Sequence, residues 1–260
     1  MSRTNPREGG LSNPVKLSIV FKPNSGNFLG YDRTKKEQFE LESLNMIILD
    51  ADRFSITGFS DDHQANYISN YVYAPKKENF KVGVFVKGSY REVANGKYLD
   101  IKNEVSGMKF SKPIFALVEY EGELVLSEIV IDSNVARSSF IKWFYDNRDA
   151  VLDKYVTLSA SKEVYSADKK TGEHKEVPKE KQKKWLTTWF KLLEIEFGED
   201  LSDKEGDNAD NADKEIQAYL KYLAGLNGDN NSPESPSKPK SDAKSINDWE
   251  ADDDEDDLPF

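Results

Sequence analysis

The sequence predicts a β-rich α+β fold, with helices added toward the C-terminus and a disordered acidic tail. Three observations predict it. Short alternating or continuously apolar runs follow one another from Val15 to Ile131, with turn residues between them. Apolar residues at helical spacing come only after Ser133. Beyond Leu226 the chain is mostly Gly, Asn, Asp, Ser, Pro and Lys, which cannot bury enough apolar surface to offset chain entropy.

The expected strands are short, and many short strands with turns between them favour a barrel or a sandwich. Two apolar runs around Glu121-Gly122 predict a hairpin, because a glycine-containing turn separates them. The predicted strands lie within residues 15–21, 39–42, 45–59 (two stretches), 67–73, 80–86, 114–118 and 124–131.

Helices are expected later in the chain. Ser133 is a candidate N-cap for a helix that reaches about residue 152. A β-hairpin is expected over residues 155–177, with its turn at 169–172. Pro178 then opens a second helix to about residue 197, and a third short helix covers 213–224 and stops at Gly225. The expected organisation is a flexible N-terminus (1–14), a body (15–197), an acidic linker (198–212), a short amphipathic helix (213–226) and a disordered tail (227–260).

Charge is distributed unevenly along the chain. The net charge is −11, yet residues 227–260 carry eleven acids against three lysines, and residues 196–226 carry nine acids against three lysines. The remaining body is therefore mildly basic, at +3. There are no cysteines, which excludes disulfides and thiolate metal sites, and no apolar run approaches the ~20 residues that span a bilayer. Residues 1–14 lack the apolar core of a signal peptide, so we expect a cytoplasmic protein. We also expect no metal or other cofactor.

The centre of the body interleaves aromatic rings with cations. Proteins that bind single strands combine a basic groove for phosphates with flat side chains on which bases stack. Tyrosine suits this role better than phenylalanine because its hydroxyl tolerates solvent, so Phe80 and Phe85 are assigned to the core. The predicted DNA-binding residues are Tyr71, Tyr73, Lys76, Lys77, Lys81, Lys87, Tyr90, Arg91, Lys97 and Tyr98. The segment from Tyr73 to Phe80 is expected to form a loop, and the segment from Lys87 to Arg91 a hairpin tip.

A second basic and aromatic patch covers residues 179–191, where four lysines precede Trp185 and Trp189. Positive charge at a helix start opposes the helix dipole, so DNA phosphate and the acidic tail or linker are candidate partners. The tryptophans themselves fit helix packing better than base stacking.

The last residues combine acids with an apolar end. Asp252, Asp253, Asp254, Glu255, Asp256 and Asp257 precede Leu258, Pro259 and Phe260. A tail that only aids solubility has no use for an exposed phenylalanine, whereas a docking peptide can place the ring in a pocket and the acids against basic residues at its rim.

This tip resembles the C-terminal peptide of bacterial and phage single-stranded DNA-binding proteins, an Asp-rich run followed by an apolar residue, Pro and Phe. The resemblance covers about nine residues, and the body shows no bacterial core motif. It implies a phage-type protein with a divergent OB-fold-like barrel, in the host cell cytoplasm. It also implies a tip that recruits replication, recombination or repair proteins such as a polymerase or helicase, and that competes with DNA for the basic groove.

Other functions have less support in the sequence. The two histidines, His63 and His174, are far apart, and no phosphate-binding or dinucleotide glycine motif is present. Asp50, Asp52, Asp61 and Asp62 are candidates for a Mg²⁺ nuclease site. The alternatives are a scaffold or regulator that docks through its tail without binding DNA, an acidic DNA mimic, and a carboxylate-metal nuclease. The expected protein is a non-catalytic single-strand binder.

Overall fold

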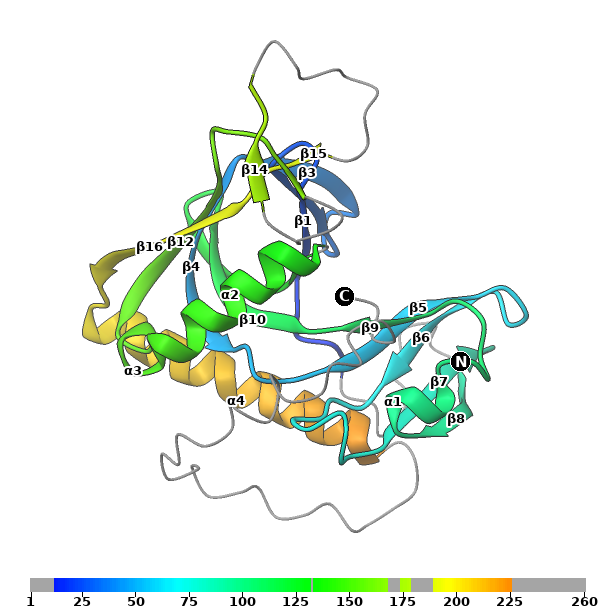
Figure 1. The fold of residues 1–260 in the computed structure, drawn as a ribbon. Coiled ribbons are helices and arrows are strands. Elements are labelled where there is room, and N and C mark those ends of the chain that lie inside the picture. Colours follow the sequence, from blue (N-terminus) through cyan, green and yellow to red (C-terminus); the bar gives the residue numbers. More distant parts are fainter. Residues whose placement is uncertain (1–11, 132, 168–173, 179–188, 226–260) are drawn as a thin grey trace. The chain divides into compact units, whose positions relative to one another are not determined.

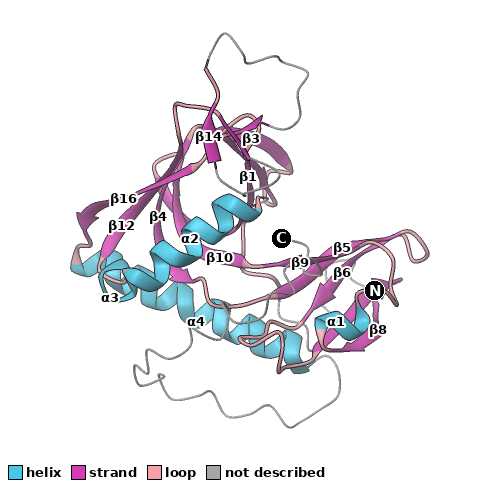
Figure 2. Cartoon of the chain, in the orientation of Figure 1, coloured by secondary structure: helices cyan, strands magenta, loops and turns pink. Residues whose placement is uncertain are grey.

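The computed structural model describes residues 12–131, 133–167, 174–178 and 189–225. Most of the secondary structure is strand (Figure 2), so the predicted β-rich α+β class is confirmed. The described chain divides into two compact units, a larger one with residues 12–53 and the described part of 112–219, and a smaller one with residues 54–111 and 220–225. The prediction of one body over 15–197 is therefore wrong, because residues 54–111 have a hydrophobic core of their own.

The larger unit is built on an eight-stranded sheet (Figure 1). Neighbouring strands are antiparallel except β1 and β11, which pair in parallel. In spatial order the strands are β16 (Leu193–Asp200), β12 (Lys154–Ala160), β4 (Ser43–Asp50), β10 (Pro113–Tyr120), β11 (Glu123–Ile131), β1 (Leu17–Lys22), β2 (Asn27–Asp32) and β3 (Glu37–Leu41). The hairpin expected around Glu121-Gly122 is confirmed as β10 and β11, and both turn residues have positive φ.

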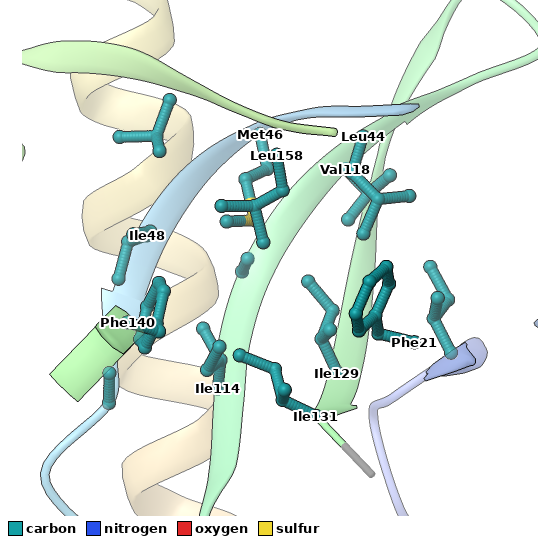
Figure 3. Close-up of a cluster of buried hydrophobic side chains, with 14 of the residues drawn as sticks. Phe21, Leu44, Met46, Ile48, Ile114, Val118, Ile129, Ile131, Phe140 and Leu158 are labelled. Carbon is teal, nitrogen blue, oxygen red and sulfur yellow. The ribbon is translucent and has the colours of Figure 1, made fainter. Parts of the chain in front are cut away.

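One face of this sheet carries the core of the larger unit. Alternate residues of the strands point to the same side, and the helix α2 (Asn134–Asp146) covers them with Phe140. Figure 3 shows Phe21, Met46 and Ile129 among the side chains that gather there. Ser133 caps α2 as predicted, since its Oγ accepts a hydrogen bond from the backbone N–H of Ala136 at 3.3 Å. The predicted helix breaks at Asn147, and the four-residue α3 (Arg148–Val151) completes it.

The smaller unit interrupts a hairpin of the large sheet. Strands β4 and β10 are antiparallel neighbours, with Ile47 opposite Leu117, and the whole of residues 54–111 is inserted in the connection between them. The insertion begins after β4 and ends before β10, which are neighbours in the large sheet. A region with its own core is therefore added without interrupting the pairing of the large sheet.

The inserted unit is a five-stranded antiparallel sheet. Its order is β8 (Ser89–Gly96), β7 (Phe80–Val86), β6 (Ala65–Ser69), β5 (Ser55–Ser60) and β9 (Met108–Ser111), with the short helix α1 (Tyr98–Ile101) between β8 and β9. The first four strands in the sequence form a meander, and the fifth returns beside the first. Among the described strands no pairing closes either sheet into a barrel, so the barrel expected from the sequence is not found.

The connection between β12 and β16 holds a three-stranded sheet. It consists of β13 (Tyr165–Ala167), β14 (His174–Glu176) and β15 (Trp189–Phe190), in the order β14-β13-β15. Of the hairpin expected over 155–177, only the pairing of β13 with β14 is confirmed, because residues 155–160 belong to β12, which pairs with β4 and β16. The expected turn at 169–172 lies outside the described residues. The helix predicted to reach residue 197 is wrong from Trp189 onward. Leu193, Ile195 and Phe197 also fit the period of a strand, and pairing with β12 decides the outcome.

Helix α4 (Asp203–Gly225) replaces the predicted acidic linker. We expected a linker over 198–212 because these residues are acidic and almost without apolar side chains. Ser202 and Glu205 instead form a capping box, in which Glu205 Oε2 accepts the backbone N–H of Ser202 at 2.8 Å. The Tyr155 hydroxyl donates to the other Glu205 oxygen at 2.7 Å, so the first turn of α4 is anchored to strand β12. The short helix expected at 213–224 is the second half of α4.

Candidate nucleic-acid interface

The sheet of the smaller unit has one buried and one exposed face. Val82 and Val84 on β7 and Tyr67 on β6 point into the core, and the residues between them point outward. Because directly paired residues share a face, the strand register defines the exposed side. We call it the outer face, and it comprises Thr57, Phe59, Asn66, Ile68, Lys81, Gly83, Phe85, Tyr90, Glu92, Asn95 and Lys109.

Aromatic side chains are exposed on this outer face. Phe59 is 44% exposed and Phe85 is 37% exposed, which is unusual for phenylalanine in strands that also line a core. Phe85 pairs directly with Tyr90 across the hairpin, and the two rings meet edge to face with their centroids 5.6 Å apart. The outer face therefore presents flat apolar surfaces of the kind on which bases stack.

Gly83 is the residue that lets Tyr90 lie against the sheet. A Cβ built on Gly83 would overlap the phenol end of the Tyr90 ring, so this ring occupies the space that a side chain at residue 83 would take. Glycine inside a strand often marks such a close approach. The Tyr90 ring is thereby held over β7, next to Phe85.

Cations lie along the same strand and at both of its ends. Lys81 is on the outer face near the start of β7, and Lys87 occupies the tight turn after it, where Lys87 and Gly88 both have positive φ. At the other end, Lys76 and Lys77 are exposed in the loop between β6 and β7. Glu78 orders this loop, because its carboxylate accepts the backbone N–H of Ala74 at 2.8 Å. Residues 54–111 contain eight lysines and arginines against six acids, so this unit is mildly basic.

The structure brings together part of the predicted DNA-binding set. Lys81 and Tyr90 share the outer face with Phe85, and Lys87 is beside them in the turn. Exposed Tyr73 lies in the loop with Lys76 and Lys77, at the opposite end of β7, and Tyr71 is half-buried just after β6. Arg91 is exposed but pairs with Val84, which places it on the opposite face from Tyr90. Lys97 is exposed just before α1.

Two of the sequence assignments are corrected. Tyr98 was predicted to stack on bases, yet it is 6% exposed and packs against Phe110 with ring centroids 4.9 Å apart. Burial also raises the pKa of the Tyr98 hydroxyl. The Tyr98 ring therefore packs in the core and is not accessible for stacking on a base. Phe85 was assigned to the core and is instead on the outer face, whereas the core assignment of Phe80 is confirmed.

The alternation of the strand predicts an exposed Phe85, but the assignment favoured tyrosine over phenylalanine as the stacking residue. In the run from Phe80 to Val86, the valines and Phe80 share one parity, and Lys81, Gly83 and Phe85 share the other. The β-branched set indicates the buried face, so Phe85 belongs with Lys81 on the exposed one. The alternation in the sequence does not predict an exposed Phe59 in the same way, because Gly58, with a positive φ, interrupts the alternation of β5.

Of the four acids considered for a magnesium site, Asp61 and Asp62 are exposed in the turn after β5, and Asp50 and Asp52 form ion pairs in the larger unit. Asp50 pairs with Arg53 and Asp52 with Arg148, each at 2.6 Å. Lys112 is buried near them with its ammonium 5.4 Å from the centre of the Tyr145 ring, and burial lowers the pKa of Lys112 to about 8. No group of three or more His, Cys, Asp or Glu side chains in the described part of the chain is arranged to hold a metal ion.

Some of the predicted elements lie outside the described residues. These are the acidic tip from Asp252 to Phe260 and the lysines of the second basic patch between residues 179 and 184. Within residues 12–131, 133–167, 174–178 and 189–225, no helix is long and apolar enough to cross a membrane. Comparison with protein families, with curated proteins and with solved structures finds no match to this chain.

Proposed function

We propose that the chain is a non-catalytic single-stranded DNA-binding protein that acts in replication or recombination, as a phage-type protein would. The observation that carries the proposal is the pair of exposed Phe85 and half-buried Tyr90 on the outer face, with Lys81 on the same strand as Phe85 and Lys87 in the adjoining turn. Stacking contributes about 1–3 kcal/mol per base and is tolerant of sequence. Lysines at both ends of β7 supply cations for the backbone of a strand that runs along it.

The geometry favours a single strand over a duplex. In a duplex the base faces are stacked on one another, so exposed rings on a flat sheet have no partner there. A single strand can offer each base face in turn. The proposal does not depend on a closed OB-fold-like barrel, because an open sheet with one exposed aromatic face serves the same purpose.

The acidic tip supports the second part of the proposal. Residues 252–260 join six consecutive acids to Leu258, Pro259 and Phe260, a combination suited to a basic pocket with an apolar floor on a replication or recombination protein. When no DNA is bound, the same acids can pair with the cations of the smaller unit. DNA binding would then release the tip for its partner.

A titration tests DNA binding directly. Fluorescent oligo-dT and a duplex of equal length are titrated with the full chain over a salt series. We expect tighter binding to the single strand, with an affinity that falls as salt rises at a slope of about 0.7 per phosphate contact. The variant Phe85→Ala should weaken binding, while Leu99→Ala, an exposed apolar residue in α1, should not. If the chain binds neither the single strand nor the duplex, DNA binding is rejected, and a scaffold that docks only through its tip is favoured.

A further inference from the structure

The outer face holds one carboxylate close to its aromatic pair. Glu92 is directly opposite Gly83 in the register of β7 and β8, and a bulge between Val82 and Gly83 shifts the pairing so that Glu92 and Asn95 point to the same side. The Asn95 amide donates to Glu92 Oε1 at 3.4 Å. The side chain of Glu92 is exposed. It is therefore a solvent-facing acid whose orientation is guided by a neighbour.

The position of Glu92 relative to Tyr90 follows from the glycine. The phenol end of Tyr90 lies over Gly83, and Gly83 is the cross-strand partner of Glu92. The carboxylate thus borders the ring on the same face of the sheet. A base stacked on Tyr90 would bring its edge, and not its face, toward Glu92.

A carboxylate at this place repels phosphate, so it weakens a purely electrostatic interface. Its chemistry is that of a hydrogen-bond acceptor, since an ionised carboxylate has no proton to donate. Cytosine and adenine carry exocyclic amino groups at a corner of the base that donate to such an acceptor, whereas the one donor on the pairing edge of thymine, its ring N3–H, lies between two carbonyl oxygens that repel a carboxylate. The carboxylate therefore matches one class of base and opposes another.

We propose that Glu92 selects bases bearing an exocyclic amino group at the position stacked on Tyr90, so that this protein prefers cytosine over thymine. The inference rests on the proposed single-strand binding and adds a base preference to it. Asn95 holds one carboxylate oxygen and leaves the other to accept from the base. Since one base per bound strand is read in this way, the preference is modest, roughly three- to tenfold.

The test compares oligo-dC with oligo-dT of equal length, for the full chain and for Glu92→Gln. We expect the native protein to bind oligo-dC more tightly, and Glu92→Gln to bring the ratio close to one, mainly by strengthening binding to oligo-dT. Glu104→Gln is the matched control, because it removes the same charge from an exposed glutamate in the turn after α1 and should leave the ratio unchanged.

A second measurement needs no variant. Oligo-dC whose N4 atoms are dimethylated keeps the pyrimidine ring but loses the donor, and should bind the native protein about as weakly as oligo-dT. Equal affinity of the native protein for all three strands, or a preference for oligo-dT, would overturn the role of Glu92 while leaving single-strand binding in place. Absence of binding to every strand would instead overturn the proposed function itself.

Discussion

Gly83 shows how one residue without a side chain can position an aromatic ring on the surface proposed to bind DNA. Its neighbours in β7 are buried valines, and the sheet leaves room above its Cα for the Tyr90 ring. The backbone at Gly83 is not in the left-handed region, so alanine fits the strand conformation there. Substitution at this position therefore separates the stability of the strand from the placement of the ring.

We predict that Gly83→Ala displaces the Tyr90 ring and lowers single-strand affinity by about fivefold or more, since stacking of one base is worth about 1–3 kcal/mol. The melting temperature should stay close to that of the native protein. Gly30→Ala is the matched control. Its Cβ would overlap the Phe39 ring, which packs with Tyr120 on the core of the larger unit, so it should lower stability without changing affinity. Unchanged affinity in Gly83→Ala would show that Tyr90 does not stack on DNA.

Lys112 makes a prediction about pH. Burial lowers its pKa in the folded state to about 8, from 10.5 for an exposed lysine, although Asp52 and Asp50 oppose the shift. Between these values the unfolded chain holds a proton that the folded chain has lost, so stability rises with pH. The gain from pH 8 to pH 9.5 should be roughly 2 kcal/mol. Above about pH 10 the raised pKa of Tyr145 acts in the opposite direction, so the test stays below it.

Urea unfolding followed by tryptophan fluorescence at pH 7, 8, 9 and 9.5 measures this effect. Lys112→Met should remove the rise, and Lys142→Met, the same change at an exposed lysine of α2, should keep it. Parallel pH profiles for the native protein and Lys112→Met would show that the buried ammonium does not titrate in this range.

At the scale of elements, local patterns predicted strands better than helices. The run from Phe80 to Val86 became β7 with the predicted bounds, because alternation and flanking turns agree there. The segment from Leu193 to Phe197 fits two periods, and only pairing with β12, more than thirty residues earlier in the chain, makes it a strand. Such pairing depends on contacts that no local window contains.

The prediction of a linker in place of the first half of helix α4 was wrong for a different reason. This half has few apolar residues, and the prediction of a linker depended on this composition alone, without the capping pair of Ser202 and Glu205. Hydrogen bonds from Ser202 and from the Tyr155 hydroxyl lower the pKa of Glu205 to about 2, so the cap keeps its charge at any ordinary pH. The capping box was readable in the sequence, whereas the contact with Tyr155 was not.

The candidate site was predictable in kind but less so in its members. Interleaved rings and cations indicated residues 67–102, and the structure places Lys81, Tyr90 and Lys87 together there. The sequence could not separate Tyr98 from Tyr90, because both are tyrosines beside a cation. What separates them is that Tyr98 begins α1, whose residues Tyr98 and Ile101 pack into the core.

At the scale of the whole molecule, opposite charges are carried on one chain. The smaller unit is mildly basic, and residues 249–260 contain seven acids. A tethered acidic segment has an effective concentration near the millimolar range for its own body, so weak pairing suffices to occupy a basic surface. Competition of this kind should be strongest at low salt, where charges are least screened.

We therefore predict that deleting residues 249–260 strengthens binding to oligo-dT several-fold at low salt and has little effect at high salt. The full chain with Leu258 and Phe260 replaced by alanine is the control. It keeps every acid, so its DNA affinity should match that of the native protein, while its docking to a partner through the tip should be lost. If the alanine variant instead binds DNA as tightly as the deletion, the apolar end and not the charge holds the tip on the body. If neither variant differs from the native protein at any salt concentration, the tip does not compete with DNA, and its acids serve only the partner.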